Sequence, residues 1–144
     1  MEPIESQRKI VLLIEDEIDL VDLYTEILNE AGYDVLPSYD GEDGIYKSKN
    51  DEWDLLLLDI MLPEKDGMAV LEEIQKANGG KKGPIVLLTD LNSEDLIERA
   101  YKLGADDYLI KSEISLDDIV KKVKHYLGWE FLSLLRFIIH VFKI

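Results

Sequence analysis

The residues of this sequence that are best suited to chemistry stand at the ends of short apolar runs. Each run has the length and composition of a strand that is buried on both faces of a parallel sheet. The polar residues at these ends are Glu15 and Asp16 after residues 9–14, Asp59 after the four leucines 55–58, Thr89 at the end of residues 84–89, and Lys111 after residues 107–110. Parallel strands end at one edge of their sheet, and open α/β folds bind ligands there. We therefore expect these side chains to share one site.

Three carboxylates at one site require a cation. Two carboxylates about 4 Å apart repel each other by roughly 1–4 kcal/mol, depending on the local dielectric. Lys111 supplies a single positive charge for Glu15, Asp16 and Asp59. A hard divalent cation with oxygen ligands would supply the remainder, and Mg²⁺ is the ion that we expect.

Each residue of this set is ambiguous when it is taken alone. Asp59 alone fits a nucleophile, a metal ligand or a helix-capping residue equally well. Thr89 alone is typical of an ordinary strand-end hydroxyl, and Lys111 alone is typical of a solvated surface charge. Tyr108, three residues before Lys111, is by itself typical of a core residue. The prediction of a site therefore depends on the joint placement of these residues.

Strand and helix patterns alternate through the chain from residue 9 to residue 127. The expected strands are 9–14, 33–38, 55–59, 84–89 and 107–110, and the expected helices are 18–31, 41–49, 67–77, one from a cap at Asn92 or Ser93 to 103, and 115–127. We expect Ile45, Tyr46 and Leu116 to face the core. Strands this apolar need helices on both faces, joined by right-handed crossovers. The predicted fold is α/β: a doubly wound (βα)5 three-layer sandwich with a flavodoxin-like parallel sheet of strand order 2-1-3-4-5.

Composition narrows the function classes. A chain of 144 residues fits one domain with a core of ordinary size. Its net charge of −15 argues against direct binding to nucleic acid, whose phosphates would be repelled. The absence of cysteine excludes disulfides and thiolate metal sites. The first nine residues are polar and unlike a signal peptide, so we expect a cytoplasmic location.

The residues at the strand ends resemble those of the receiver domain of two-component response regulators, of the chemotaxis-regulator type. The matching positions are Glu15 and Asp16, Asp59 with Pro63 and Gly67 four and eight residues later, Thr89, and Lys111 within GADDYLIK. The resemblance covers residues 9–127, which we assign to a receiver domain over residues 1–128. Because every member of the set closes its own strand pattern, the match is specific.

The resemblance implies a phosphorylation-activated signalling domain and not an enzyme that turns over a separate substrate. A histidine kinase or phosphotransfer protein would transfer a phosphoryl group to Asp59, and the domain would assist its own phosphorylation and dephosphorylation. The implied roles are direct Mg²⁺ ligation by Asp16, Asp59 and the backbone carbonyl of Met61, ligation through water by Glu15, and contact with the phosphoryl oxygens by Thr89 and Lys111.

A conformational switch is also implied by the resemblance. Tyr108 stands where the family has a rotating aromatic residue. If Thr89 moves to bond a phosphoryl oxygen, it leaves space into which Tyr108 can turn. The face formed by the fourth helix, fifth strand and fifth helix would then shift between two populations, to be read by a downstream protein partner or a second copy of the chain.

Two residues depart from the family pattern beside the expected site. Asp90 follows Thr89 where the family usually has a small residue, and Ser112 follows Lys111 where it usually has a proline in a cis bond. An acid at position 90 is expected to restrain phosphorylation or its persistence, because it would repel an incoming dianion. A cis bond before a residue other than proline costs about 3–4 kcal/mol, so we expect either a trans loop or stored strain at Ser112.

Two rival functions fit less well. A phosphatase of the haloacid dehalogenase type needs a second acid two residues after its nucleophile, and here that position is Met61. Such enzymes also carry a cap domain, for which this chain has no room. A nucleotide-binding module needs a glycine-rich loop after the first strand, and none follows residues 9–14.

The last sixteen residues, 129–144, form an apolar amphipathic tail. Glu130, Ser133, Arg136, His140 and Lys143 recur at helical spacing among large apolar residues. A helix of this length is about 24 Å long, shorter than the ~30 Å hydrocarbon core, so we expect no transmembrane span. The alternatives are packing against its own domain or in a homodimer, peripheral contact with a membrane, or a terminus without a role. We favour burial through protein contacts, since the acidic body would be repelled from anionic lipid.

Overall fold

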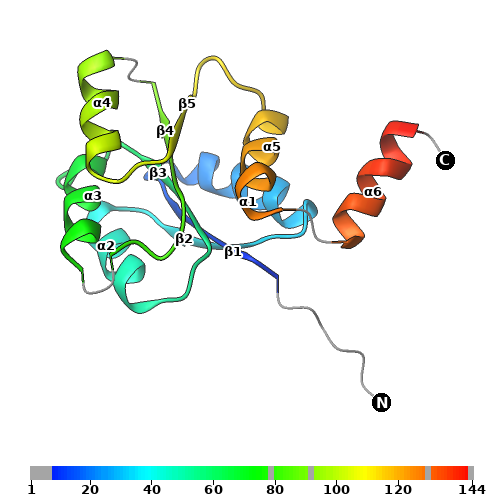
Figure 1. The fold of residues 1–144 in the computed structure, drawn as a ribbon, viewed down its shortest axis with the longest axis horizontal. Helices are drawn as coiled ribbons and strands as arrows, with labels where there is room; N and C mark the ends of the chain where they lie inside the picture. Colours follow the sequence, from blue (N-terminus) through cyan, green and yellow to red (C-terminus); the bar gives the residue numbers. More distant parts are fainter. Residues whose placement is uncertain (1–7, 78–79, 91–92, 129–130, 143–144) are drawn as a thin grey trace.

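In a computed structural model of the protein, residues 8–77, 80–90, 93–128 and 131–142 are described, and a five-stranded sheet forms their centre (Figure 1). The strands are β1 (Ile10–Ile14), β2 (Asp34–Ser38), β3 (Leu55–Asp59), β4 (Ile85–Thr89) and β5 (Asp107–Ile110). Their order is β2-β1-β3-β4-β5, and every neighbouring pair is parallel. The predicted order and direction of the strands are confirmed.

Helices cover both faces of the sheet and complete three layers (Figure 1). They are α1 (Ile18–Glu30), α2 (Gly41–Asn50), α3 (Gly67–Lys76), α4 (Glu94–Lys102) and α5 (Leu116–Leu127). The helices α1 and α5 pack on one face, and α2, α3 and α4 pack on the other. Each connection from a strand through a helix to a parallel strand thus crosses one face of the sheet, as the doubly wound fold requires.

The central strand β3 divides its leucines between the two cores. Leu56 and Leu58 belong to the core beneath α2, α3 and α4, whereas Leu55 and Leu57 belong to the core beneath α1 and α5. All four side chains are fully buried. Burial of one leucine stabilises a fold by about 1.5–3 kcal/mol relative to exposure. The uninterrupted leucine run is therefore explained by a strand that needs apolar side chains on both faces.

Two predicted core residues are exposed instead. Tyr46 is 63% exposed, whereas its neighbour Ile45 fills the core position of α2. Leu116 is 36% exposed because it begins α5 at the carboxyl edge of the sheet, where the core ends. Ser93 is the N-cap residue of α4 but makes no side-chain cap bond, and the alternative cap Asn92 lies outside the described residues.

Side-chain caps fix where three helices begin. The Asp40 carboxylate accepts the Asp43 N–H at the start of α2, and the Asp66 carboxylate accepts the Ala69 N–H at the start of α3. Ser115 and Asp118 exchange hydrogen bonds in a capping box at the start of α5. Such caps typically contribute about 1 kcal/mol each. The helices α3 and α5 thus begin at fixed points after the loops that leave β3 and β5.

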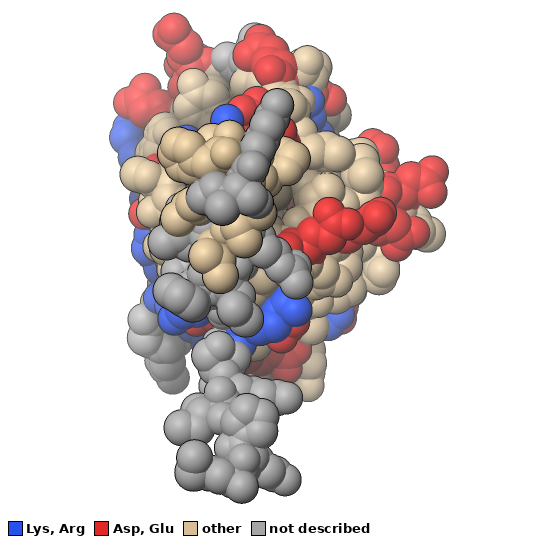
Figure 2. All heavy atoms as spheres, turned by 90° about the vertical axis from the view of Figure 1, so that its right-hand side faces the viewer, with Lys and Arg blue, Asp and Glu red and all other residues tan. Residues whose placement is uncertain are grey.

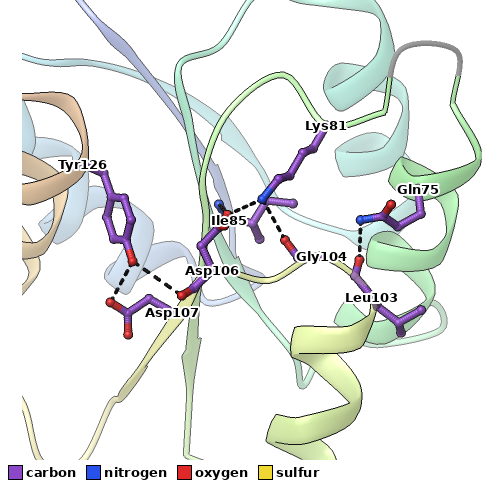
Figure 3. Close-up of polar contacts among 8 residues, drawn as sticks. All are labelled: Gln75, Lys81, Ile85, Leu103, Gly104, Asp106, Asp107 and Tyr126. Carbon is purple, nitrogen blue, oxygen red and sulfur yellow. Dashed lines mark hydrogen bonds and ion pairs between the residues drawn. The ribbon is translucent and has the colours of Figure 1, made fainter.

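Polar contacts hold the amino edge of the sheet, opposite the strand ends that carry the candidate residues (Figure 3). The Asp106 carboxylate accepts the Ile85 N–H at 2.8 Å and pairs with Lys81 at 2.6 Å. Tyr126 of α5 donates to the Asp107 carboxylate at 3.0 Å. The starts of β4 and β5 are therefore tied to each other and to α5 at this edge.

A sixth helix, α6 (Phe131–Phe142), follows α5 and lies beyond it at the right of Figure 1. Its described side chains include Leu135, Ile139, Val141 and Phe142, which are exposed. Figure 2 views this side of the molecule and shows acidic side chains at its upper and right-hand margins. None of the described helices combines the length and hydropathy that crossing a bilayer requires. The tail residues Glu130 and Lys143 lie outside the described residues.

Candidate functional site

The three predicted carboxylates meet at the carboxyl edge of the sheet. Glu15 and Asp16 follow β1, and Asp59 closes the adjacent strand β3. One oxygen from each lies within 4.8 Å of the others. Glu15 and Asp59 are only 1% and 5% exposed, whereas Asp16 is half-buried. The expected cluster therefore forms, with Asp16 on its solvent side.

Lys111 completes the cluster from the far side of β4. Its Nζ donates to the Asp59 Oδ2 at 3.1 Å and to the Glu15 carboxylate. Burial disfavours the charged lysine, but its bonds to Glu15 and Asp59 outweigh this and raise the pKa of Lys111. Burial raises the pKa of Glu15 to about 7, although the Lys111 hydrogen bond acts in the opposite direction. The site is thus short of positive charge for its carboxylates.

The donor set fits a hard divalent cation. Carboxylate oxygens are the ligands that Mg²⁺ prefers, and Mg²⁺ sites in proteins commonly use one or two carboxylates together with water. The Asp59 Oδ1 accepts the Met61 N–H at 3.0 Å, so the loop after β3 fixes the orientation of this carboxylate. The side chain of Met61 points outward and is 59% exposed. The loop therefore brings the backbone of Met61, and not its side chain, to the cluster.

Gly67 closes the loop that carries Asp59 and Met61. Its N–H donates to the Ile60 carbonyl at 2.8 Å. A Cβ at position 67 would lie 2.6 Å from both the Asp59 carbonyl oxygen and the Ile60 Cα. Such an approach is closer than van der Waals contact allows, so only glycine fits here. This packing explains the glycine eight residues after Asp59.

Thr89 ends β4 between Asp59 and Lys111. Thr89 is fully buried, and its carbonyl accepts the Lys111 N–H at 2.9 Å. In the sheet register Asp59 lies opposite Leu88, and Thr89 lies opposite Ile110. Thr89 therefore lies one residue closer to the carboxyl edge than Leu88, the residue of β4 that pairs with Asp59.

Tyr108 is separate from the acidic cluster. It lies within β5, is half-buried, and makes an edge-to-face contact with Tyr101 of α4 at 6.3 Å between ring centroids. The two rings line a groove of about 680 Å³ between α4 and β5. Other residues that line it are Ile97, Glu94, Glu98 and Glu113. The structure thus places Tyr108 at a surface beside the site and not within it.

A contact between the two departures from the family pattern was not predicted. The Asp90 Oδ1 accepts the Ser112 N–H at 3.0 Å. No cis peptide bond occurs within the described residues, which confirms the trans alternative for the loop at Ser112. The two residues are 22 positions apart, and only the pairing of β4 with β5 brings their loops together. The spacing of Asp90 and Ser112 in the sequence therefore could not have predicted this bond.

Comparison with known proteins identifies the family. The response regulator receiver domain family matches residues 11–124. The transcriptional regulatory protein CiaR of Streptococcus pneumoniae is 40% identical over 101 residues, which are 70% of this chain and 44% of CiaR. The chain therefore spans less than half the length of this curated relative.

Solved structures show the same fold. A two-component response regulator from Clostridium difficile has a TM-score of 0.73 at 30% identity, over 82% of this chain and 94% of the other. A CheY-like receiver domain protein from Methanospirillum hungatei has a TM-score of 0.75 at 28% identity, over 83% and 93%. The receiver domain of a sensor histidine kinase from Pseudomonas aeruginosa, solved with magnesium in its active site cleft, has a TM-score of 0.75 at 25% identity, over 85% and 99%. With its parallel sheet, its acidic cluster and these relatives, the chain belongs to the response regulator receiver domain family.

Proposed function

We propose that Asp59 is the phosphoacceptor of this receiver domain and that a histidine kinase or phosphotransfer protein is its donor. The observation that carries the proposal is the position of Asp59, buried at the end of β3 between two further carboxylates and Lys111. In the reaction an Asp59 oxygen forms a bond to phosphorus. The bond from phosphorus to the donor histidine nitrogen breaks, and its electron pair leaves with that nitrogen.

Mg²⁺ is the proposed cofactor, held by Asp16, Asp59 and the backbone carbonyl of Met61, with Glu15 acting through water. When bound, the ion supplies positive charge to the transferring phosphoryl oxygens. Support comes from the mutual distance of the three carboxylates and from the magnesium in the Pseudomonas aeruginosa relative. The chain's own contribution is to orient Asp59 through the Met61 N–H and to leave the half-buried Asp16 facing solvent.

Lys111 and Thr89 are proposed to hold the transferred group. The phosphoryl oxygens on Asp59 would accept hydrogen bonds from the Lys111 ammonium and the Thr89 hydroxyl. Lys111 already bonds Asp59, so it needs no large movement to reach a group on the same oxygen. Preorganised positive charge of this kind is the main source of rate enhancement in phosphoryl transfer.

The output surface is proposed to be the groove between α4 and β5, together with the adjoining face of α5. Its lining combines aromatic and apolar residues with three acids and one base: Tyr101, Tyr108, Ile97, Ile110, Glu94, Glu98, Glu113 and Lys102. A downstream protein segment with an apolar anchor and basic flanks would complement this chemistry. Movement of Thr89 on phosphorylation would change the room available to Tyr108, and hence the shape of the groove.

Three further proposals concern the cellular location of the domain, its binding to nucleic acid and the role of the tail. We place the domain in the cytoplasm and expect no direct binding to nucleic acid, because the net charge of −15 would repel its phosphates. The relative CiaR is named as a transcriptional regulatory protein, and the chain spans 44% of it. Residues 129–144 are proposed as a separate segment that mediates homodimerisation, with peripheral membrane contact as the alternative.

Phosphorylation of purified protein with acetyl phosphate and Mg²⁺ tests the assignment. The wild type should take up one phosphoryl group per chain, and Asp59→Asn should take up none. Asp22→Asn, an exposed carboxylate of α1, is the matched control and should be labelled like the wild type. Comparable labelling of Asp59→Asn would refute the proposal, and continuous turnover of a generic phosphatase substrate would favour the phosphatase alternative.

A further inference from the structure

The pairing of β4 with β5 continues beyond the last residues of both strands. The register ends with Thr89 opposite Ile110. The next N–H of the β5 chain, from Lys111, donates to the Thr89 carbonyl at 2.9 Å. The following N–H, from Ser112, donates to the Asp90 Oδ1 at 3.0 Å. A side-chain oxygen that follows β4 thus accepts the N–H that comes after the end of the strand pairing, beside the acidic cluster.

These two bonds hold the peptide groups on both sides of the Lys111 Cα, the one before it through the Lys111 N–H and the one after it through the Ser112 N–H. The Glu113 N–H donates to the Ile110 carbonyl at 2.9 Å and closes the turn that leaves β5. Lys111 is 12% exposed and extends its side chain inward to Glu15 and Asp59. The direction of this side chain depends on the backbone of Lys111. Without the bond to Asp90, only the Lys111 N–H would tie this backbone to the β4 chain.

The bond explains why the two departures from the family pattern occur together. The donor is the backbone N–H of Ser112, which a proline at this position would lack. The acceptor is a side-chain carboxylate oxygen, which a small residue such as alanine at position 90 would lack. An acid after Thr89 and a residue other than proline after Lys111 are therefore the two halves of one contact.

We propose that Asp90 is a positioning residue that holds Lys111 in place for phosphoryl transfer, through its hydrogen bond to the Ser112 N–H. The inference rests on the proposed role of Asp59 and Lys111. Asp90 itself acts through the β5–α5 loop and need not touch the phosphoryl group. Loss of the contact should slow phosphorylation, because a displacement of a charged group by about 1 Å can cost up to a hundredfold in rate.

The opposing explanation assigns Asp90 a purely electrostatic effect. A free carboxylate beside Thr89 would repel an incoming dianionic donor, so its removal should raise the phosphorylation rate. The two explanations thus predict changes of opposite sign for Asp90→Ala. They also differ for Asp90→Asn, which removes the charge but keeps an oxygen that can accept the Ser112 N–H.

The experiment compares phosphorylation rates of the full chain by acetyl phosphate, a small donor that needs no protein docking. Asp90→Ala should be slowed by roughly three- to tenfold, whereas Asp90→Asn should keep the wild-type rate or exceed it. Ser112→Ala is the matched control on the other side of the bond. It retains the backbone N–H and should behave like the wild type.

Amide hydrogen exchange provides a readout that is independent of phosphorylation. The Ser112 N–H should be protected in the wild type, Asp90→Asn and Ser112→Ala, and should lose protection in Asp90→Ala. If Asp59 is not labelled in the wild type, the proposed function fails, and exchange still decides whether the contact exists. An unchanged or higher rate for Asp90→Ala, or unchanged exchange at Ser112 in that variant, would overturn the inference.

Discussion

Lys111 reaches past β4 to Asp59, with 3.1 Å between Nζ and Oδ2 across 52 residues of sequence. The same ammonium group bonds Glu15 at the end of β1. One buried cation therefore joins the ends of three strands at the carboxyl edge of the sheet. Its removal would leave two carboxylates buried without a partner of opposite charge.

The first prediction concerns stability of the metal-free protein. Lys111→Met should lower the free energy of unfolding by about 3 kcal/mol, because breaking a buried ion pair leaves uncompensated charge. Mg²⁺ should stabilise this variant more than the wild type, since the ion replaces the missing positive charge. Urea denaturation with and without Mg²⁺ measures both effects. Lys102→Met, which removes an exposed pair with Glu98, should change stability by less than about 1 kcal/mol.

A second prediction concerns the metal ligands. Asp16→Asn should weaken Mg²⁺ binding by roughly tenfold or more and slow phosphorylation, because one charged oxygen ligand is lost. Titration calorimetry with Mg²⁺ gives the affinity directly. Glu17→Gln, at the next position outside the cluster, is the control and should bind Mg²⁺ nearly as the wild type does. Equal affinities for Asp16→Asn and the wild type would remove Asp16 from the site.

The third prediction tests the close packing of the loop after β3. Gly67→Ala should destabilise the protein by about 1–3 kcal/mol, because its Cβ would overlap backbone atoms of Asp59 and Ile60. It should also slow phosphorylation, since the clash displaces the residue that carries the acceptor carboxylate. Gly80→Ala is the control: its φ is +67° but no atom lies within 4 Å of the added Cβ. It should cost only the backbone strain, about 1 kcal/mol, and leave the phosphorylation rate unchanged.

The strands and the acidic cluster could be predicted from the sequence because each apolar run stops at a polar residue. That residue gives the position of the strand end, and the ends of parallel strands meet at one edge. Leu55 to Leu58 had to be buried on both faces, so Asp59 had to stand at an edge. Helical periodicity was less informative at the helix starts. Leu116 continues the apolar stripe of α5, yet it is exposed at the carboxyl edge of the sheet. The contact of Asp90 with Ser112 depends on how two loops meet, which no local pattern encodes.

The fourth prediction concerns pH and the amino edge of the sheet. Despite partial burial, the Lys122 ammonium at 2.9 Å and hydrogen bonds from Tyr108 and Tyr126 hold the pKa of Asp107 below its ordinary value. A depressed pKa in the folded state stabilises the protein above the ordinary pKa, and this contribution is lost as the pH falls through the folded value. Asp107→Asn should therefore cost about 1–2 kcal/mol at pH 7, with a smaller difference below about pH 4.

Urea denaturation of Asp107→Asn and the wild type between pH 3 and pH 7 measures this difference, with Asp22→Asn as the control. The phenol of Tyr126 provides a second readout. Burial, together with the hydrogen bond to Asp107, raises the pKa of Tyr126 to about 12. Loss of the Asp107 charge should bring the spectroscopic titration of Tyr126 to lower pH. A constant stability difference across the pH range would contradict the assigned role of Asp107.

The last prediction concerns the tail. Leu135, Ile139 and Phe142 recur at intervals of four and three residues on α6 and are 42%, 43% and 68% exposed. An apolar stripe of this kind is stabilised when a second apolar surface covers it, and a second copy of the chain offers a self-complementary one. We expect the full chain to dimerise in a concentration-dependent way. A variant with serine at all three positions, and a chain that ends at Gly128, should both be monomeric by light scattering.

Sedimentation with anionic vesicles tests whether a protein or a membrane covers this apolar stripe. The full chain should not sediment with anionic vesicles, because the acidic body opposes the approach of α6 to their surface. Wild type and serine variant should be phosphorylated at equal rates by acetyl phosphate, since α6 lies beyond α5 and outside the acidic cluster. A monomeric full chain would refute dimerisation, and vesicle binding that the serine substitutions abolish would establish the membrane as the partner.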